Sequence, residues 1–127
     1  MSKSLEDLVR DAEAHVPKVT AEEAHEAHLA GDLILDVREP AELKQDGRIE
    51  NALNIPRGIL ETRACDEAKT KDTKLCKSRG ARVPVLCASG VRATLAANTL
   101  RTMGYDATAI DGGLKSWKEA GLDIQAS

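Results

Sequence analysis

Residues 83–103 constrain the fold of this chain more than any other part of the sequence. Val83–Cys87 is a short run without charged side chains, typical of a parallel strand that is covered on both faces. Ala88-Ser89-Gly90 then indicates a tight turn, and residues 91–103 follow as a helix whose alanine side chains allow close packing on a sheet. A buried strand that leads directly into such a helix predicts an α/β domain.

Short apolar runs and helical patterns alternate along the rest of the chain. The predicted strands are residues 33–37, 52–55, 83–87 and 106–110, and the predicted helices are residues 20–30, 40–45, 91–103 and 114–120. A further amphipathic helix begins after Ser4 and ends near Pro17, and we interpret it as an appendage of the domain. The alternation favours a mainly parallel sheet whose ligands bind at the carboxyl ends of the strands.

Residues 61–82 do not follow this alternation. They show little apolar periodicity and are crowded with charged side chains: Arg63, Asp66, Glu67, Lys69, Lys71, Asp72, Lys74, Lys77, Arg79 and Arg82. We expect an exposed connection here, with room for one irregular helix.

The composition limits both the core and the partners. The chain has 127 residues, a length typical of one domain. It has one Trp, one Tyr and no Phe, so the core must be aliphatic and the aromatic platforms that stack nucleic-acid bases are missing. Eighteen Lys and Arg against 21 Asp and Glu give a net charge of -3, which offers no general attraction for a phosphate backbone. No apolar run approaches the roughly 20 residues that cross a bilayer. We expect neither a nucleic-acid nor a membrane partner.

The amino-terminal residues and the cysteines favour a cytoplasmic location. Glu6 and Asp7 interrupt any apolar core of a secretion signal. Cys65, Cys76 and Cys87 cannot all pair with one another, and a chain of this length folds without disulfides. The spacing of the first two fits no zinc site, so we interpret them as ordinary thiols.

Cys87 ends the buried strand and immediately precedes the glycine turn. The N–H groups of the turn and of the first helical turn have no helical partners, so we expect them to face the sulfur, where the helix dipole adds positive potential. Arg92 adds a cation in the same loop. Such surroundings stabilise a thiolate, the nucleophilic form of cysteine. The alternative is a cysteine that packs as a small apolar residue, and Gly90 together with Arg92 favours the nucleophile.

Three segments, in sequence order, resemble the signatures of the single-domain rhodaneses, a family of sulfurtransferases. They are Leu35–Glu42 (LDVREPAE), Cys87–Ala93 (CASGVRA) and Asp111–Trp117 (DGGLKSW). The resemblance spans about residues 18–124, which we expect to form one rhodanese domain after a helical extension of residues 1–17. It implies an α/β fold of three layers, with a mainly parallel central sheet flanked by helices on both faces.

The resemblance also implies that Cys87 cycles between a thiolate and a persulfide. The thiolate would take a sulfane sulfur from thiosulfate or a small persulfide. A nucleophilic acceptor would then remove this sulfur, and the acceptor would be cyanide or a thiol, either small or on a protein. No metal or organic cofactor is implied, and the oligomeric state stays open. The family's loop binds the substrate, which assigns that role to Ala88, Ser89, Gly90, Val91 and Arg92.

Some positions depart from the two-domain thiosulfate enzymes of this family. Those enzymes carry a basic residue at the loop position held here by Ser89, and another near Glu42. Without these cations we expect weaker binding of dianionic thiosulfate, which favours a less charged persulfide donor. Asp36, Arg38 and Glu39 are interpreted as a network of ion pairs and turns, in which Asp36 and Arg38 support the loop.

Two other functions use the same cysteine. Phosphatases and arsenate reductases of this fold have one more residue between the cysteine and the arginine than the four found here between Cys87 and Arg92. The tighter ring suits a sulfur atom better than a phosphoryl group. A persulfide carrier or sensor for one protein partner would differ from an enzyme only in the lack of turnover without that partner.

The remaining candidate residues are interpreted structurally. His25 and His28 share a helical face with Glu22, but two imidazoles without a third firm ligand favour a solvated face over a metal site. Trp117 is expected to fill the apolar core.

Overall fold

The computed structural model describes residues 2–126, which contain a five-stranded sheet with the strand order β1-β5-β4-β2-β3. The strands are β1 (Lys18–Val19), β2 (Leu35–Asp36), β3 (Leu53–Asn54), β4 (Arg82–Leu86) and β5 (Asp106–Ile110). Every neighbouring pair is parallel. The carboxyl ends of the strands therefore meet at one edge of the sheet, where ligands of such folds bind.

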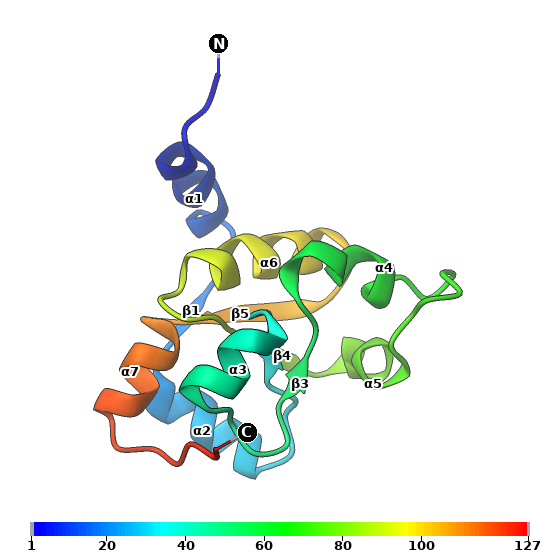
Figure 1. Cartoon of the computed structure of the whole chain (residues 1–127). Helices are drawn as coiled ribbons and strands as arrows, with labels where there is room; N and C mark the ends of the chain where they lie inside the picture. The colour runs from blue at the N-terminus through cyan, green and yellow to red at the C-terminus, as the bar shows by residue number, and fades with distance from the viewer. Residues whose placement is uncertain (1, 127) are drawn as a thin grey trace.

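Helices occupy most of the connections between the strands (Figure 1). The α-helices are α1 (Leu5–Glu13), α2 (Ala21–Leu29), α3 (Pro40–Asp46), α4 (Leu60–Ala64), α5 (Thr73–Cys76), α6 (Val91–Thr102) and α7 (Gly113–Glu119). Two 3-10 helices, η1 (Arg57–Ile59) and η2 (Lys77–Gly80), precede α4 and β4.

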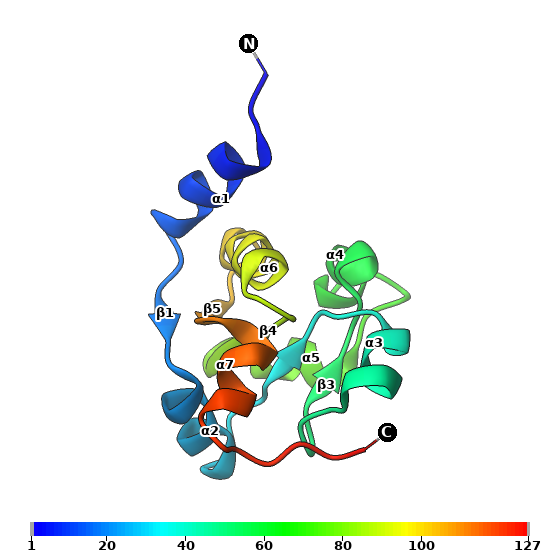
Figure 2. The same ribbon diagram turned by 60° about the vertical axis from the view of Figure 1, so that its left-hand side comes forward.

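The helices lie in two layers, with the sheet between them (Figure 2). One face of the sheet is covered by α4 and α6, and the other by α2 and α7. Helix α1 packs against α6 and projects beyond the sheet, as both views show. The structure confirms the expected α/β fold with a parallel sheet between helical layers.

Strand β4 divides the core in two because successive side chains of a strand point to opposite faces. Val83, Val85 and Cys87 belong to the cluster beneath α6, whereas Leu86 belongs to the cluster that contains Trp117. All five are buried. The burial on both faces explains the absence of charged residues from Val83 to Cys87, and it confirms Trp117 as a core residue.

Both amino-terminal helices begin with a capping box. The Ser4 hydroxyl accepts a hydrogen bond from the Asp7 N–H, and the Asp7 carboxylate accepts one from the Ser4 N–H. Thr20 and Glu23 make the same reciprocal pair at the start of α2. Two helix N–H groups that would lack a partner are satisfied in this way, and the predicted start of each helix is confirmed.

Some predicted strands are shorter in the structure, and one strand was not predicted. Regular pairing covers Leu35–Asp36 and Leu53–Asn54 instead of residues 33–37 and 52–55. Beyond this pairing the Asn54 side chain donates to the Asp36 and Arg38 carbonyls. Strand β1 lies at the sheet edge beside β5. Its two residues are too few to show a periodicity.

The expectation of an exposed connection at residues 61–82 is wrong in part. The segment forms most of α4, all of α5 and η2, and the beginning of β4. Ala64 and Leu75 are completely buried in the cluster beneath α6. Arg79 stacks on the ring of Tyr105 at 4.1 Å from its centroid, and the Tyr105 hydroxyl donates to the Ala64 carbonyl. A few buried apolar side chains thus hold this segment against the core, and its many charged residues mask the apolar periodicity.

No helix within residues 2–126 has both the length and the apolar character needed to cross a membrane.

Candidate active site

Cys87 follows the last residue of β4, at the carboxyl edge of the sheet, and is 1% exposed. Two backbone N–H groups point at its sulfur: that of Gly90 lies 3.0 Å from Sγ, and that of Ala93 lies 3.3 Å away. Both come from the turn and the first turn of α6, where N–H groups have no helical partner. The arrangement favours negative charge on the sulfur or on an atom attached to it.

The turn requires glycine at position 90. Gly90 has a φ of 111°, in the left-handed region, and directly precedes α6. Its carbonyl accepts from both the N–H and the hydroxyl of Thr94, at 3.0 and 2.8 Å. These bonds hold Gly90 to the first turn of α6.

Helix α7 holds the loop from behind. The Leu114 N–H donates to the Cys87 carbonyl at 2.8 Å, and the Lys115 N–H donates to the Ala88 carbonyl at 3.2 Å. Gly113 makes this approach possible, because a Cβ at this position would lie 2.4 Å from the Cys87 oxygen. The contact explains the glycine at position 113, and the sequence did not reveal that this residue lies against Cys87.

Arg92 is bound by Glu42, which lies in α3. Arg92 Nη1 and Nη2 lie 2.6 and 2.9 Å from the two carboxylate oxygens of Glu42. The hydrogen bonds with Arg92 lower the pKa of Glu42 to about 2. They are also the main cause of a raised pKa for Arg92, to which the Cys87 charge adds a smaller effect. The cation expected beside Cys87 is present, but a carboxylate balances its charge.

Glu42 was not predicted as a site residue. It has the helical position of an ordinary capping residue, since its carboxylate also accepts from the Glu39 N–H at the start of α3. Only its distance of 50 positions from Arg92 in the sequence hid the pair, which could have been suspected from the two opposite charges in neighbouring signatures.

Asp36 and Arg38 form a buried ion pair. The Arg38 side chain is 0% exposed, and its Nε and Nη2 donate to the Asp36 carboxylate at distances from 2.7 to 3.2 Å. Nη2 also donates to the Gly47 carbonyl at 3.0 Å. The pair therefore fixes the connection from β2 through α3, which carries Glu42. We propose that this is how Asp36 and Arg38 support the loop.

The other loop residues offer little side-chain chemistry. Ala88 is half-buried, Ser89 is exposed and Val91 is 38% exposed. Backbone N–H groups are thus the main polar groups that this loop directs at the sulfur.

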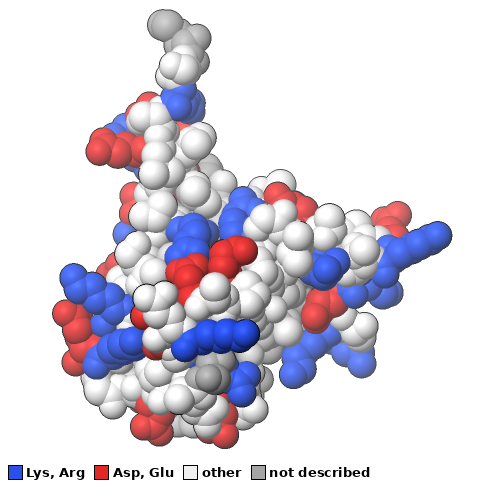
Figure 3. Space-filling model, in the orientation of Figure 1, with Lys and Arg blue, Asp and Glu red and all other residues white. Residues whose placement is uncertain are grey.

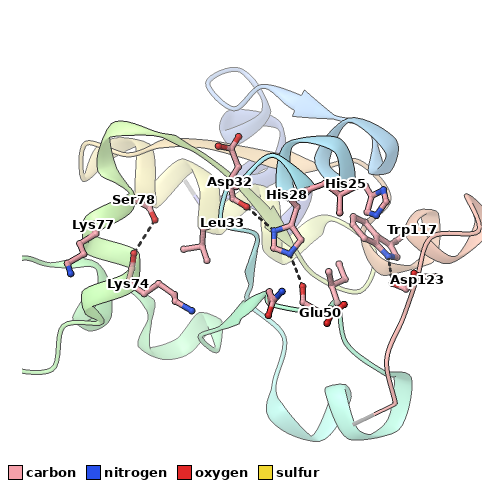
Figure 4. A pocket seen from close by; sticks show the side chains of 14 residues that line it. His25, His28, Asp32, Leu33, Glu50, Lys74, Lys77, Ser78, Trp117 and Asp123 are labelled. Atoms are coloured by element: carbon pink, nitrogen blue, oxygen red, sulfur yellow. Dashed lines mark hydrogen bonds between the residues drawn. The ribbon is translucent and has the colours of Figure 1, made fainter.

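A larger, open cavity lies elsewhere. About 640 Å³ in volume, it is lined by residues that precede β2 and β3, at the amino edge of the sheet and opposite Cys87 (Figure 4). The two ring nitrogens of His28 lie 2.8 and 2.7 Å from the carbonyl oxygens of Asp32 and Glu50, and His25 meets the edge of Trp117. Within residues 2–126 no three His, Cys, Asp or Glu side chains are grouped to hold a metal ion.

The other two cysteines are free and half-buried. The Cys76 thiol lies 3.6 Å from the Arg63 carbonyl, and burial raises its pKa. A raised pKa leaves less thiolate, which makes Cys76 a poorer nucleophile.

Acidic and basic side chains are mixed over the face that carries α3, α6 and α7 (Figure 3). This mixture agrees with the small net charge and gives no continuous basic surface on that face.

The family model of the rhodanese-like domain matches residues 20–120. The chain belongs to the rhodanese-like family. The match includes the Cys87 loop, both members of the Glu42–Arg92 pair and the glycines at positions 112 and 113.

Curated relatives carry sulfurtransferase names. A "Sulfurtransferase" of Allochromatium vinosum is 33% identical over 95 residues, which cover 74% of this chain and 78% of that protein. A "Putative thiosulfate sulfurtransferase, mitochondrial" of Schizosaccharomyces pombe is 38% identical over 80 residues, which cover 58% of this chain and 53% of that protein. The matched region is thus about half the length of the yeast protein.

A solved structure from Rhodopseudomonas palustris is similar along almost the entire chain, with a TM-score of 0.90 and 26% identity. The match covers 98% of this chain and 96% of that one, which is described as a protein of unknown function and possible tyrosine phosphatase.

The contact between α7 and the loop makes a first prediction. Gly113→Ala would place a methyl group against the Cys87 carbonyl, whereas the Cβ of Gly121→Ala would meet open space. Both glycines have a positive φ, 58° and 73°, so both variants have a similar backbone cost. We expect Gly113→Ala to lose about 1–3 kcal/mol more unfolding free energy than Gly121→Ala in urea titrations. Equal losses would contradict the contact.

The Glu42–Arg92 pair makes a second prediction. Since the pKa of Glu42 falls from 4.5 to about 2, the pair stabilises the fold fully above pH 4.5 and loses this effect as the pH falls towards 2. The carboxyl carbon of Glu42 should titrate near pH 2 by NMR in the parent and near its ordinary value in Arg92→Ala. Arg101→Ala, which removes an ion pair with Asp106, is the control and should leave the titration unchanged. A parent midpoint near 4.5 would disprove the pairing.

Proposed function

We propose that this protein is a sulfurtransferase that carries sulfane sulfur as a persulfide on Cys87. The Cys87 thiolate attacks the outer sulfur of the donor, a new S–S bond forms on Cys87, and the donor's bond to that sulfur breaks. When the donor is thiosulfate, the remainder leaves as sulfite. When the donor is a small persulfide, the remainder leaves as a thiolate. A nucleophilic acceptor attacks the same outer sulfur and releases the Cys87 thiolate; cyanide becomes thiocyanate.

The observation that carries this proposal is the pair of N–H groups directed at Cys87 Sγ from 3.0 and 3.3 Å. A thiolate and a terminal persulfide are both anionic, and backbone donors held by the fold stabilise them without reorganisation. The rhodanese-like family and the sulfurtransferase names of its relatives agree with this chemistry.

We further propose that a small persulfide is a better donor than thiosulfate. The only cation of the loop, Arg92, is balanced by Glu42 at 2.6 Å, and position 89 is an uncharged serine. A dianion would have to approach without a net positive charge in the loop, whereas a persulfide brings less charge.

The phosphatase interpretation fits less well. A phosphoryl group needs a larger ring of donors than four intervening residues provide, and the charge of Arg92, which it would also need, is balanced by Glu42. We therefore expect no hydrolysis of aryl phosphates that depends on Cys87.

The acceptor in the cell is proposed to be a thiol, either small or on a protein. A carrier or sensor for one protein partner differs from the enzyme in a single measurable respect, turnover without the partner. The chemistry requires reduced cysteines, and Cys65, Cys76 and Cys87 are all free, so a cytoplasmic location remains part of this proposal.

Cys87→Ser should abolish thiocyanate formation from a persulfide donor and cyanide, because a hydroxyl cannot form the persulfide. The matched control is the double variant Cys65→Ser, Cys76→Ser, which should retain nearly the parent rate, since both thiols lie outside the loop. Thiocyanate release is followed colorimetrically. Full activity of Cys87→Ser would refute the proposed function, and loss of turnover in the double variant would show that sulfur leaves through a second thiol.

A further inference from the structure

His28 lies in the last turn of α2, with its ring between two backbone carbonyl groups (Figure 4). Its Nδ1 is 2.8 Å from the Asp32 oxygen, and its Nε2 is 2.7 Å from the Glu50 oxygen. The first carbonyl follows α2, and the second lies in the turn that precedes β3. One half-buried side chain thus joins two segments along the wall of the open cavity at the amino edge of the sheet.

Both carbonyl groups belong to segments that have backbone hydrogen bonds of their own. The Asp32 N–H donates to the Ala27 carbonyl at 2.9 Å, which holds the chain just past the end of α2. Glu50 belongs to a turn in which the Ala52 N–H donates to the Ile49 carbonyl at 3.2 Å. The two oxygens therefore face the ring from positions that the backbone already restricts.

The two contacts determine which form of the ring fits. A carbonyl oxygen only accepts, so both ring nitrogens of His28 must donate if both bonds are made. Neutral imidazole has a single N–H, and its bare nitrogen would face an oxygen lone pair at 2.7 or 2.8 Å. The imidazolium has two N–H groups and satisfies both carbonyls. The helix dipole acts in the same direction, because it stabilises a cation at the C-terminal end of α2.

The charged groups around the ring also favour a cation. Besides His28, the titratable side chains that line this cavity are Asp32, Glu50, Asp123, Lys74, Lys77 and His25. The lysines come from α5 and η2, and Asp123 comes from the segment after α7. Three carboxylates against two ammonium groups leave an excess of negative charge, which a protonated His28 balances. His25 contacts the edge of Trp117 instead of a carbonyl.

We propose that His28 is a pH-operated latch between the end of α2 and the turn that precedes β3. As an imidazolium the ring holds both segments. When the ring loses its proton to solvent, one of the two bonds is lost, and the cavity wall at residues 49–52 is released. Imidazole side chains change charge between about pH 5 and 8, so the latch closes at the acidic end of this range and opens at the alkaline end. The inference does not depend on sulfur chemistry at Cys87.

The first test reads the protons on the ring directly. Nitrogen NMR of the full chain, labelled at histidine, distinguishes a ring nitrogen that carries a proton from a bare one. Both nitrogens of His28 should carry a proton at about pH 5, and only one should at about pH 9. A bare nitrogen at the lower pH would disprove the latch, and two protons at the higher pH would show a permanent bridge and disprove the switch.

The second test compares the parent with His28→Gln by urea unfolding at the same two pH values. A bond that only the cation makes stabilises the fold at low pH and is lost as the pH rises. The ratio of the folding constants of parent and variant should therefore be about tenfold larger at the lower pH. The matched control, His15→Gln, removes an exposed imidazole outside the cavity and should give one ratio at both pH values.

The outcomes separate a latch from a merely structural residue. A ratio for His28→Gln that does not change with pH would show that the ring only fills space, and an equal change in His15→Gln would show a general effect of histidine titration. Either result overturns the proposal. If His28→Gln does not fold, hydrogen exchange of the parent decides. Protection of the Ala52 amide, relative to the amides of α6, should fall about tenfold from the lower to the higher pH, and a constant relative protection would overturn the latch.

Discussion

The sulfur of Cys87 sits within hydrogen-bond distance of two backbone N–H groups, and most of the surrounding architecture serves to keep them there. Each donor depends on a different element, the glycine turn and the first turn of α6. Backbone donors cannot be moved by a rotamer change, so their direction is as rigid as the fold. The N-terminus of α7 secures the same loop from behind through the carbonyls of Cys87 and Ala88. The loop is therefore fixed on both sides of the reacting atom.

Two ion pairs connect this loop to the rest of the sheet. Glu42 binds Arg92 from α3, and the buried Asp36–Arg38 pair fixes the connection that leads from β2 into α3. The first pair also determines the electrostatics, because it leaves the loop with directed dipoles and little net charge. This is the basis of our proposal that the site prefers an anion of low charge, such as a persulfide, to a dianion.

Local patterns revealed the elements on which the chemistry depends, and long-range contacts were beyond them. The run Val83–Cys87 predicts a strand covered on both faces, and Ser4 and Thr20 predict helix starts, because each signal lies within a few residues. Glu42 and Arg92 meet across 50 positions, so their opposite charges could only suggest a pair, and no local spacing indicates it. Gly112-Gly113 signals a turn, but not its position against Cys87. In residues 61–82 a few apolar side chains, such as Leu75, dock a charged segment whose periodicity is too weak to read.

The central claim is that sulfur resides on Cys87 between two transfers. Peptide mapping by mass spectrometry, after incubation with glutathione persulfide and before any acceptor is added, tests it most directly. The account predicts a gain of one sulfur atom on the peptide that contains Cys87, and its complete removal when cyanide is added. Sulfur found on the peptides of Cys65 or Cys76 with Cys87 unmodified, or a Cys87 adduct that cyanide leaves in place, would contradict it.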